Sequence, residues 1–439
     1  MDKRVLIIGE IFVDTHLDII DINGPLIRLG GIFHSARAFS AIGVEYVLAY
    51  YAPDYLDDDI NYYSCVLKSQ GCFRLGEVKN APNVMLVNES REVGDQGYYN
   101  ILKDQAVYTE IEQLTNIVNI TKPTDILIYP GRYDTKKILI DLRDYKGRIH
   151  VDFHYDSENI KPDTIPVLST IILSTSSIVF KSLCNGNVHD LISYFKPFNA
   201  EFILFKENRG GALCYSFPKD NYYESPAYYV PTMHSVGVGD IYNAVFISDL
   251  INRDTEKNMR LASQCAARYA ETMLYEKFQV NVQAVLGNLE QMIGLEGVRL
   301  SWEERKIINI YIAAPDFPDI NTLLLDELSE SLRYHNFNPR LPIRENGIVR
   351  ETMTPEEKLQ IFRNDLDLLS TCHLLIAVLL INDAGTLVEL GMFAQSGKPT
   401  IVFDPYNICQ NMFVTHTPNY FCKTIGEVID ATYQCLRRR

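Results

Sequence analysis

Long apolar runs, paired cysteines and an excess of basic residues are all missing from this 439-residue sequence. No stretch of about 20 apolar residues occurs, so we expect no helix that spans a membrane. The net charge of −15 would repel a phosphate backbone on average, so we expect no nucleic-acid partner. The nine cysteines are odd in number and include no Cys-x-x-Cys pair. We therefore expect free thiols in a cytoplasmic protein, no structural zinc, and no metal-ligating residue.

The composition is that of a globular protein. Hydrophobic residues make up 47% and charged residues 22% of the chain, and these shares exclude a disordered, collagen-like or coiled-coil protein. The length predicts two or three domains. The run RVLIIGE near the start is too short for the apolar core of a signal peptide, and it predicts a first buried strand instead.

Apolar strand-like runs alternate with helix-like segments along the whole chain, and this alternation predicts an α/β protein with largely parallel sheets. The expected strands are Val5–Ile8, Tyr46–Tyr50, Ile126–Tyr129, Ile149–Asp152, Ile178–Phe180, Phe202–Phe205, Ile308–Ala313, Leu374–Val378 and Thr400–Phe403. The expected helices are Ser35–Ile42, Ile241–Asn252, Met259–Tyr275, Asn281–Met292, Leu323–Arg333, Pro355–Leu369 and Thr386–Ser396.

A break in this pattern lies at about residue 300. The segment Gly294–Lys306 is charged, carries two glycines and precedes a new strand-like run. We therefore expect two domains, over residues 1–298 and 305–439.

The second domain carries a charged cluster at the expected end of a strand. Asn382–Gly385 form an expected turn before a helix, and Asp383 is placed to cap that helix. Glu389 then falls on the first or second helical turn, close to the strand ends where open α/β sheets bind ligands. A carboxylate kept ionised by a helix N-terminus can attack an anomeric carbon. A capped helix with a surface Glu is also common, so the cluster alone leaves a structural role open.

Four motifs in order make this domain resemble the nucleoside 2-deoxyribosyltransferase family from Lys306 to about Ala431. The motifs are IYIAAPDF, which contains Tyr311, Asn364–Asp365–Leu366, DAGTLVELG followed by SGKP, and Asn411–Met412. The resemblance implies a smaller flavodoxin-like or Rossmann-like domain built on a doubly wound parallel sheet.

The resemblance also implies roles for five residues. Glu389 would be the nucleophile that attacks C1′ of a 2′-deoxynucleoside, and the deoxyribose would pass to another base or to water. Asp365 would contact the base and manage its proton, and Tyr311 would orient Glu389. Asp383 would bind the 5′-hydroxyl, and its charge favours nucleosides over the phosphates taken by related glycosidases with Ser there. Asn411 would come from a neighbouring subunit, so the likeness implies a homo-oligomer with shared sites and no cofactor.

The strongest local feature of the first domain is the run SVGVGDIYNAV. Gly237 and Gly239 stand just before Asp240 at the start of an expected helix, where glycines expose backbone N–H groups to an anion. Asp240 is placed to take a proton from a hydroxyl while those amides stabilise a transferring phosphoryl group. A glycine turn with an Asp cap would give the same pattern.

Together with three earlier segments, this run resembles the ribokinase/PfkB family of sugar and nucleoside kinases over residues 1 to about 290. The segments are GEIFVDTHLD, RLGGIFHSARAFSAIG and FILFKENRGGALCYS. The resemblance implies a central sheet flanked by helices, a small β lid, Asp240 as the catalytic base, and ATP with Mg²⁺ as cofactors if the domain is active. It also implies a sugar site with Asp14, Gly30 and Gly31, and an anion hole and ATP site with Gly237, Val238, Gly239, Asn208 and Gly210.

Two departures from the kinase pattern put turnover in doubt. His34 or Ser35 stands where the family usually has Asn, and FKSLCNGN lacks the Glu that helps the family to organise Mg²⁺. Catalysis by positioning is sensitive to such losses.

Three function hypotheses follow. The first is a nucleoside-processing enzyme that combines deoxyribosyl transfer with phosphorylation, whose partners are nucleosides, bases and ATP. The second is an N-glycosidase that depletes nucleosides or nucleotides and carries a degenerate kinase-like sensor. The third is a catalytically inactive binding protein, and the joint presence of Tyr311, Asp365, Asp383 and Glu389 argues against it.

Overall fold

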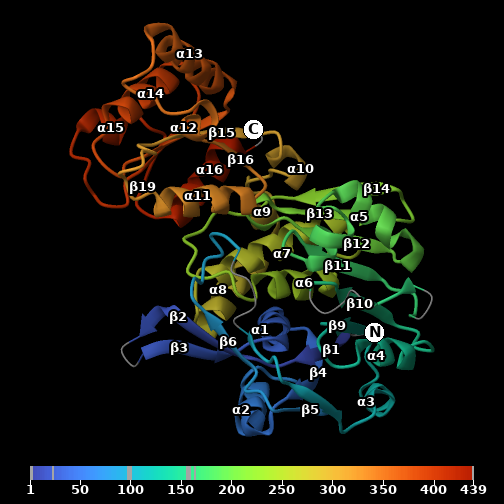
Figure 1. The fold of residues 1–439 in the computed structure, drawn as a ribbon. Coiled ribbons are helices and arrows are strands. Elements are labelled where there is room, and N and C mark those ends of the chain that lie inside the picture. The colour runs from blue at the N-terminus through green and yellow to red at the C-terminus, as the bar shows by residue number, and fades with distance from the viewer. Residues whose placement is uncertain (1–2, 22–23, 96–100, 155–159, 163–164, 438–439) are drawn as a thin grey trace. The chain divides into compact units, whose positions relative to one another are not determined.

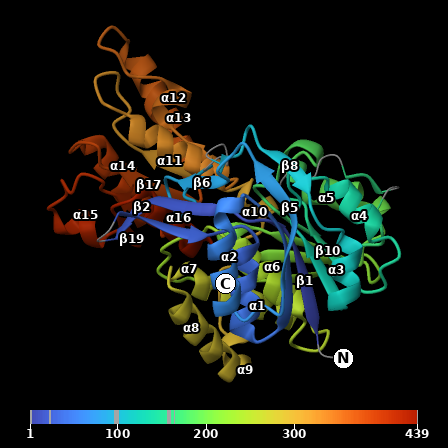
Figure 2. The same cartoon turned by 90° about the horizontal axis from the view of Figure 1, so that it is seen from below.

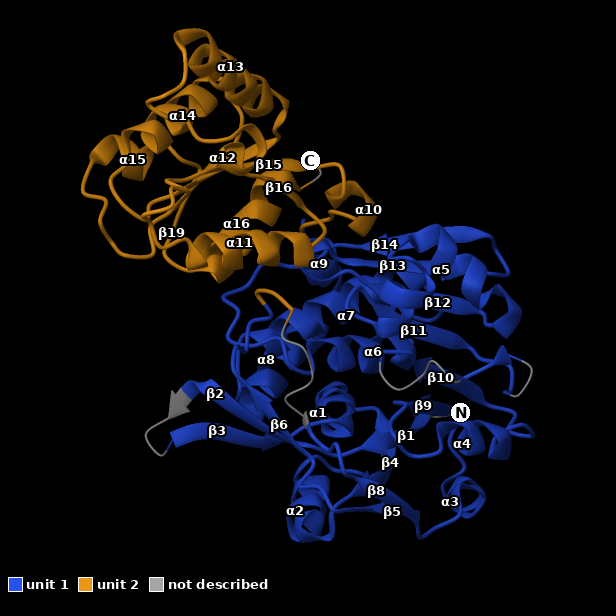
Figure 3. Cartoon of the chain, viewed as in Figure 1, with its two compact units in different colours: residues 1–92, 96–297 blue, residues 93–95, 298–439 orange. Residues whose placement is uncertain are grey.

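The computed structural model describes residues 3–21, 24–95, 101–154, 160–162 and 165–437. The chain forms two compact units (Figure 3). Unit 1 is Met1–Glu92 with Gln96–Gly297, and unit 2 is Val93–Asp95 with Val298–Arg439. Both units alternate strands and helices, which confirms the α/β prediction. Among the described helices, none has both the length and the apolarity to cross a bilayer.

The centre of unit 1 is a ten-stranded sheet in the order β14-β13-β12-β11-β10-β9-β1-β4-β5-β8 (Figure 1). The antiparallel neighbours in this sheet are β12–β13, β13–β14 and β5–β8, and all its other neighbouring strands run parallel. The strands are β1 (Arg4–Glu10), β4 (Glu45–Ala52), β5 (Cys72–Lys79), β8 (Val107–Glu110), β9 (Asp125–Ile128), β10 (Arg148–Asp152), β11 (Thr170–Ser174), β12 (Phe202–Lys206), β13 (Ala212–Ser216) and β14 (Asn221–Ser225).

A separate four-stranded sheet of unit 1, in the order β3-β2-β6-β7, is the small β lid that the kinase resemblance implied. Its strands are β2 (Val13–Asp21), β3 (Gly24–Leu29), β6 (Val84–Val87) and β7 (Ile101–Leu102). β2 and β3 form an antiparallel pair in which Asp14 lies directly opposite Arg28.

Four helices of unit 1 build its main core on one face of the large sheet: α1 (Ile32–Ile42), α6 (Val238–Ser248), α7 (Thr255–Ala270) and α8 (Tyr275–Gly287). Apolar side chains from these helices pack on alternate residues of β1, such as Val5 and Ile7. Figure 2 shows other helices on the opposite side of the sheet. The remaining α-helices are α2 (Asp57–Val66), α3 (Leu114–Thr121), α4 (Thr135–Asp141), α5 (Val188–Phe195) and α9 (Leu289–Ile293).

One predicted strand is wrong. Ile178–Phe180 is not extended, because Val179–Leu183 form a π-helical turn. The strand at this place in the sheet is β11, whose five residues are all buried. Apolar periodicity alone does not separate a short buried strand from a buried helical turn, so the run TIILS was missed.

Three predicted helices have different ends. The helix expected over Ile241–Asn252 stops at Ser248, because Asp249 adopts the left-handed conformation that Asp tolerates. The helix expected over Met259–Tyr275 ends at Ala270. The one expected over Asn281–Met292 is two helices, α8 and α9, separated at Asn288, whose backbone is not helical.

Unit 2 is a doubly wound sheet of five parallel strands in the order β16-β15-β17-β18-β19. Side chains alternate along β15 (Asn309–Ala313): Ile310 and Ile312 face α11 and α16, whereas Tyr311 and Ala313 face α13 and α14. Both faces are buried, as expected for parallel strands. The other strands are β16 (Asn338–Arg340), β17 (Leu374–Val378), β18 (Thr400–Phe403) and β19 (Tyr420–Cys422). The helices are α10 (Trp302–Arg305), α11 (Leu323–Tyr334), α12 (Pro342–Asn346), α13 (Pro355–Thr371), α14 (Ala384–Gln395), α15 (Met412–His416) and α16 (Ile425–Leu436).

Candidate active sites

Asp383 begins α14 in unit 2, and it is the N-cap that the sequence predicted. Its Oδ2 accepts hydrogen bonds from the backbone N–H of Thr386 at 2.7 Å and from the Thr386 hydroxyl at 2.8 Å. Both bonds go to the same oxygen, so the cap does not use Oδ1. The capping bonds fix the first turn of α14, and Glu389 follows on the second turn.

The Tyr311 hydroxyl donates a hydrogen bond of 2.7 Å to Oε1 of Glu389. Tyr311 is 1% exposed and lies on the β15 face that α14 covers, whereas Glu389 is half-buried. The bond joins two segments that are 78 residues apart. The strand alternation and the helix cap together place the hydroxyl and the carboxylate within reach of each other.

The three carboxylates of this site influence one another electrostatically. Burial raises the pKa of Glu389 to about 7; the Tyr311 bond lowers this pKa, and the charges of Asp365 and Asp383 raise it. Burial also raises the pKa of Asp365. A hydrogen bond of 2.8 Å, which Nδ2 of Asn346 donates to Oδ1 of Asp365, acts in the opposite direction and lowers this pKa. Glu389 therefore titrates near neutral pH, and its ionised form is the one that can act as a nucleophile.

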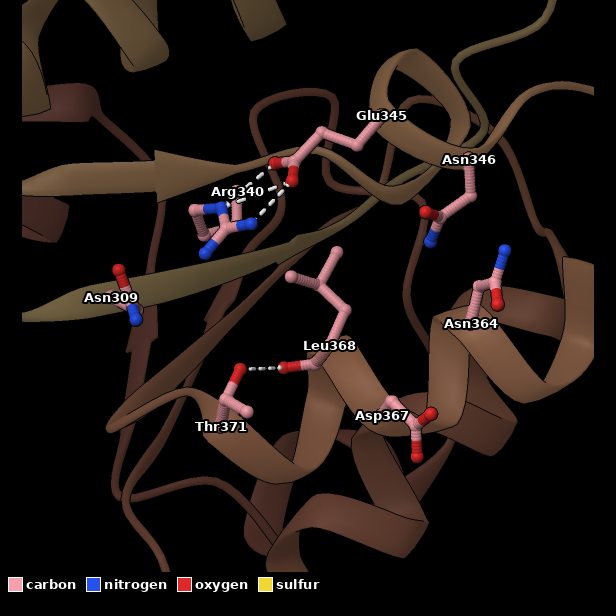
Figure 4. Close-up of a pocket in the computed structure, with 8 residues that line it drawn as sticks. All are labelled: Asn309, Arg340, Glu345, Asn346, Asn364, Asp367, Leu368 and Thr371. Atoms are coloured by element: carbon pink, nitrogen blue, oxygen red, sulfur yellow. Dashed lines mark hydrogen bonds and ion pairs between the residues drawn. The ribbon is translucent and has the colours of Figure 1, made fainter.

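Asn346 is a residue of this site that the sequence analysis missed. It lines an open cavity of about 470 Å³ next to α12 and α13 (Figure 4). An Asn at the end of a short helix gives no sequence signal for such a role. The cavity is lined by Asn309, Arg340, Glu345, Asn346, Asn364, Asp367, Leu368 and Thr371.

Asn411 lies outside the Tyr311–Glu389 contact network. It is exposed and caps α15 through a 2.9 Å bond from the Phe413 N–H to its side-chain oxygen. The next two residues, Met412 and Phe413, are 73% and 84% exposed. A contribution of Asn411 to the site of a neighbouring subunit stays a prediction.

In unit 1, both glycines before Asp240 lie close to another side chain, and at Gly237 the contact and the backbone conformation require glycine. Gly237 caps α6 with φ of 77°, and a Cβ there would fall 2.2 Å from the His34 ring. A Cβ on Gly239 would fall 3.3 Å from Nζ of Lys206. The start of α6, Gly237–Val238–Gly239, therefore lies beside the Lys206 ammonium group, and a positive charge at a helix N-terminus suits an anion.

Lys206 and Asp152 form a buried ion pair beside Asp240. Nζ of Lys206 lies 3.1 Å from Oδ2 of Asp152 and 2.9 Å from Oδ1 of Asn243. Burial raises the pKa of Asp240 to about 7, the charge of Lys206 lowers it, and the charges of Asp152 and Asp14 raise it. A carboxylate with a pKa near 7 suits a general base.

The predicted sugar-site residues also lie together. Asp14 is fully buried, and a Cβ on Gly30 would fall 2.1 Å from its Oδ1. Gly31 has φ of 59°, and a Cβ there would fall 2.2 Å from the carbonyl oxygen of Glu10. His34, at the position where the family has Asn or next to it, places Nε2 3.1 Å from Oδ2 of Asp14.

The residues of unit 1 bear differently on its two predicted ligands, ATP and Mg²⁺. A phosphate group fits the α6 start, with the Gly239 amide and Lys206. Asn208 and Gly210 form a short 3-10 turn just after β12, which carries Lys206. Mg²⁺ prefers oxygen ligands, but residues 175–187, between β11 and α5, contain no Asp or Glu. Within the described residues, no three His, Cys, Asp or Glu side chains group as a metal site. Mg²⁺ usually binds through one or two carboxylates together with phosphate oxygens of its ligand, so Mg²⁺ binding by unit 1 stays a prediction.

Residues 310–417 match the family model described as nucleoside 2-deoxyribosyltransferase. The matched segment contains Tyr311, Asp365, Asp383, Glu389 and Asn411, which are all the residues that the sequence assigned to this site.

The rest of the chain is similar to solved ribokinases. Ribokinase from Arabidopsis thaliana, complexed with ribose and ATP, superposes with a TM-score of 0.50 at 8% identity, covering 67% of this chain and 100% of that chain. Ribokinase from Giardia lamblia has a TM-score of 0.50 at 14% identity, with 66% and 100% covered. These matches establish a ribokinase fold. No curated protein sequence matches the chain.

The Tyr311–Glu389 contact predicts a change in titration. Tyr311→Phe removes the bond that stabilises the ionised carboxylate, so the pKa of Glu389 should rise above about 7. Hydrogen bonds to charged groups contribute about 1.5–3 kcal/mol, which corresponds to a rise of about one unit or more. The measurement is the carboxyl ¹³C shift of labelled glutamate, assigned with Glu389→Gln. Tyr420→Phe is the control, and an unchanged pKa in Tyr311→Phe would contradict the interpretation.

Proposed function

We propose that the deoxyribosyltransferase unit cleaves the N-glycosidic bond of 2′-deoxynucleosides through Glu389. The observation that supports this best is the ordered carboxylate, which accepts a hydrogen bond from Tyr311 beside two further carboxyl groups. An oxygen of ionised Glu389 forms a bond to C1′ while the C1′–N bond breaks and its electron pair leaves with the base. The product is a covalent deoxyribosyl ester.

Asp365 supplies the proton that the leaving base takes up. Its pKa is raised by burial, which favours the protonated form that can donate a proton, and the Asn346 amide holds its carboxyl group in place. A second base then attacks C1′ with its nitrogen, returns the proton to Asp365 and releases Glu389. Water in place of that base gives hydrolysis, which is the N-glycosidase alternative.

The assembly is proposed to be a homo-oligomer. Exposed Met412 and Phe413 beside Asn411 form an apolar surface next to the residue that the family likeness assigns to a neighbouring site. This chemistry uses no cofactor, and the ligands of this unit are nucleosides and free bases.

Replacement of the nucleophile tests the reaction directly. Glu389→Ala should lower glycosidic cleavage by about 10³-fold or more, because no other carboxylate takes its place. The change should leave the melting temperature almost unaltered, since loss of a half-buried carboxylate removes a desolvation cost. Release of free base from each deoxynucleoside is measured by chromatography. Glu330→Ala, on the exposed side of α11, is the control, and retained activity in Glu389→Ala would disprove the assignment.

The charge of Asp383 is proposed to select nucleosides over 5′-monophosphates. Two unit charges about 4 Å apart repel by roughly 1–4 kcal/mol at effective dielectric constants of about 80 to 20. Asp383→Ser removes the charge but keeps a side-chain oxygen that can cap α14. The variant should therefore shift the ratio of kcat/KM values toward the monophosphate by about fivefold or more. Wild-type preference for the monophosphate would instead support the nucleotide-depleting glycosidase.

We propose that unit 1 binds a sugar or nucleoside and transfers phosphate to it from ATP. Asp240 takes the hydroxyl proton, the hydroxyl oxygen bonds to the terminal phosphorus, and the bond to the ADP oxygen breaks with its electron pair. The raised pKa of Asp240 and the open α6 start beside Lys206 support this role. The carboxylate-free segment 175–187 favours the alternative, in which the unit binds the ligand without transfer.

Asp240→Asn separates the two possibilities. The amide keeps the shape but removes the base, so phosphorylation should fall by roughly 10²–10⁴-fold. ATP binding should persist because the phosphates contact backbone N–H groups at the α6 start. Glycosidic cleavage by the other unit is the internal control. If the unmodified protein phosphorylates nothing in a panel of sugars and nucleosides, the kinase role is wrong and a binding role replaces it.

A further inference from the structure

Arg28 is a buried cation of the lid that the family likeness did not assign. It lies opposite Asp14 in the β2–β3 pair, and its Nε is 3.7 Å from Oδ2 of Asp14. The Arg28 side chain is 9% exposed and that of Asp14 is 1% exposed. Opposite charges at directly paired positions of two antiparallel strands attract each other, so the pair fixes the two side chains relative to one another.

The guanidinium group of Arg28 is held in place by its outer nitrogens. One donates to the carbonyl oxygen of Val236 at 3.1 Å, the other to Sδ of Met273 at 3.4 Å, and the group lies 5.4 Å from the centre of the Tyr269 ring. Among the described residues, the inner nitrogen, Nε, has no hydrogen-bond partner, and neither has Oδ1 of Asp14, whereas Oδ2 of Asp14 lies 3.1 Å from Nε2 of His34. A buried polar atom left unpaired costs about 1–3 kcal/mol, so these atoms call for a ligand.

The geometry identifies the kind of ligand atom. A separation of 3.7 Å is too long for a direct hydrogen bond, but it is short enough that one hydroxyl oxygen could make hydrogen bonds of about 2.8–2.9 Å to both groups. Such a hydroxyl accepts from the Nε–H and donates to the carboxylate. His34 does not compete as a cation, because burial lowers its pKa to about 4 and leaves the ring neutral at physiological pH.

We propose that Arg28 is a specificity-determining residue of the sugar site, where its Nε–H and the Asp14 carboxylate hold the same ligand hydroxyl. The inference rests on the proposed function of unit 1, since it takes Asp14 as part of a sugar or nucleoside site. It adds that the ligand must carry a hydroxyl at this point. A ribose-type ligand therefore binds, and the analogue that lacks this hydroxyl binds weakly.

Isothermal titration without ATP or metal tests the proposal on the full chain. The probes are uridine and adenosine, each with its 2′-deoxy and 3′-deoxy forms, and D-ribose. Arg28→Lys keeps the charge but loses the Nε–H, so affinity for the ribonucleoside should fall about tenfold or more. The loss should be absent for the one deoxy analogue that lacks the bridged hydroxyl. Arg74→Lys, which removes a partly buried arginine paired with Asp57, is the matched control.

The outcomes separate this inference from the function on which it rests. If Arg28→Lys weakens all analogues equally, or none, Arg28 does not hold a ligand hydroxyl, although the sugar site stands. If no probe binds the unmodified chain, both the sugar site and the inference are wrong. Should Arg28→Lys fail to fold, Arg28→Gln combined with Asp14→Asn removes both charges together, and this variant must lose the discrimination between the ribonucleoside and the same analogue.

Discussion

The hydrogen bond between Tyr311 and Glu389 is the contact on which the chemistry of unit 2 depends. It forms only because β15 turns Tyr311 toward α14 and because the Asp383 cap fixes where α14 begins. Burial of a carboxylate is unfavourable, and this bond offsets part of that cost. The result is a carboxylate that titrates near neutrality and has a fixed orientation, as the proposed nucleophile requires.

In unit 1, a nearby cation offsets part of the cost of burying a carboxylate. Asp240 is also half-buried with a pKa raised to about 7, and the ammonium of Lys206 opposes that rise. Lys206 is itself held by Asp152 and Asn243, so the positive charge has a fixed place at the start of α6. A fixed ammonium there supplies charge close to where phosphate would bind, in a unit whose segment 175–187 lacks carboxylates.

The sequence predicted the parts of each site that local rules govern. The Asp383 cap follows from an Asp before a helical pattern, and the strands Leu374–Val378 and Thr400–Phe403 agree with β17 and β18 because parallel strands are continuous apolar runs. Residues that act through tertiary contacts were not predicted. Asn346 reaches Asp365 across 19 residues, and Arg28 reaches Val236 across 208. Neither contact leaves a local pattern, because it depends on how separate elements pack.

The two sites place opposite demands on the sugar. Departure of a base through an oxocarbenium-like transition state is easier when C2′ carries no electron-withdrawing hydroxyl, and the proposed nucleophile Glu389 would therefore suit 2′-deoxynucleosides. The Asp14–Arg28 pair, in contrast, is spaced for a hydroxyl between its two groups. If that hydroxyl is the 2′-hydroxyl, one ligand cannot be optimal for both sites. The two units would then act on separate ribose and deoxyribose pools, and a ribose ligand of unit 1 would not compete for Glu389.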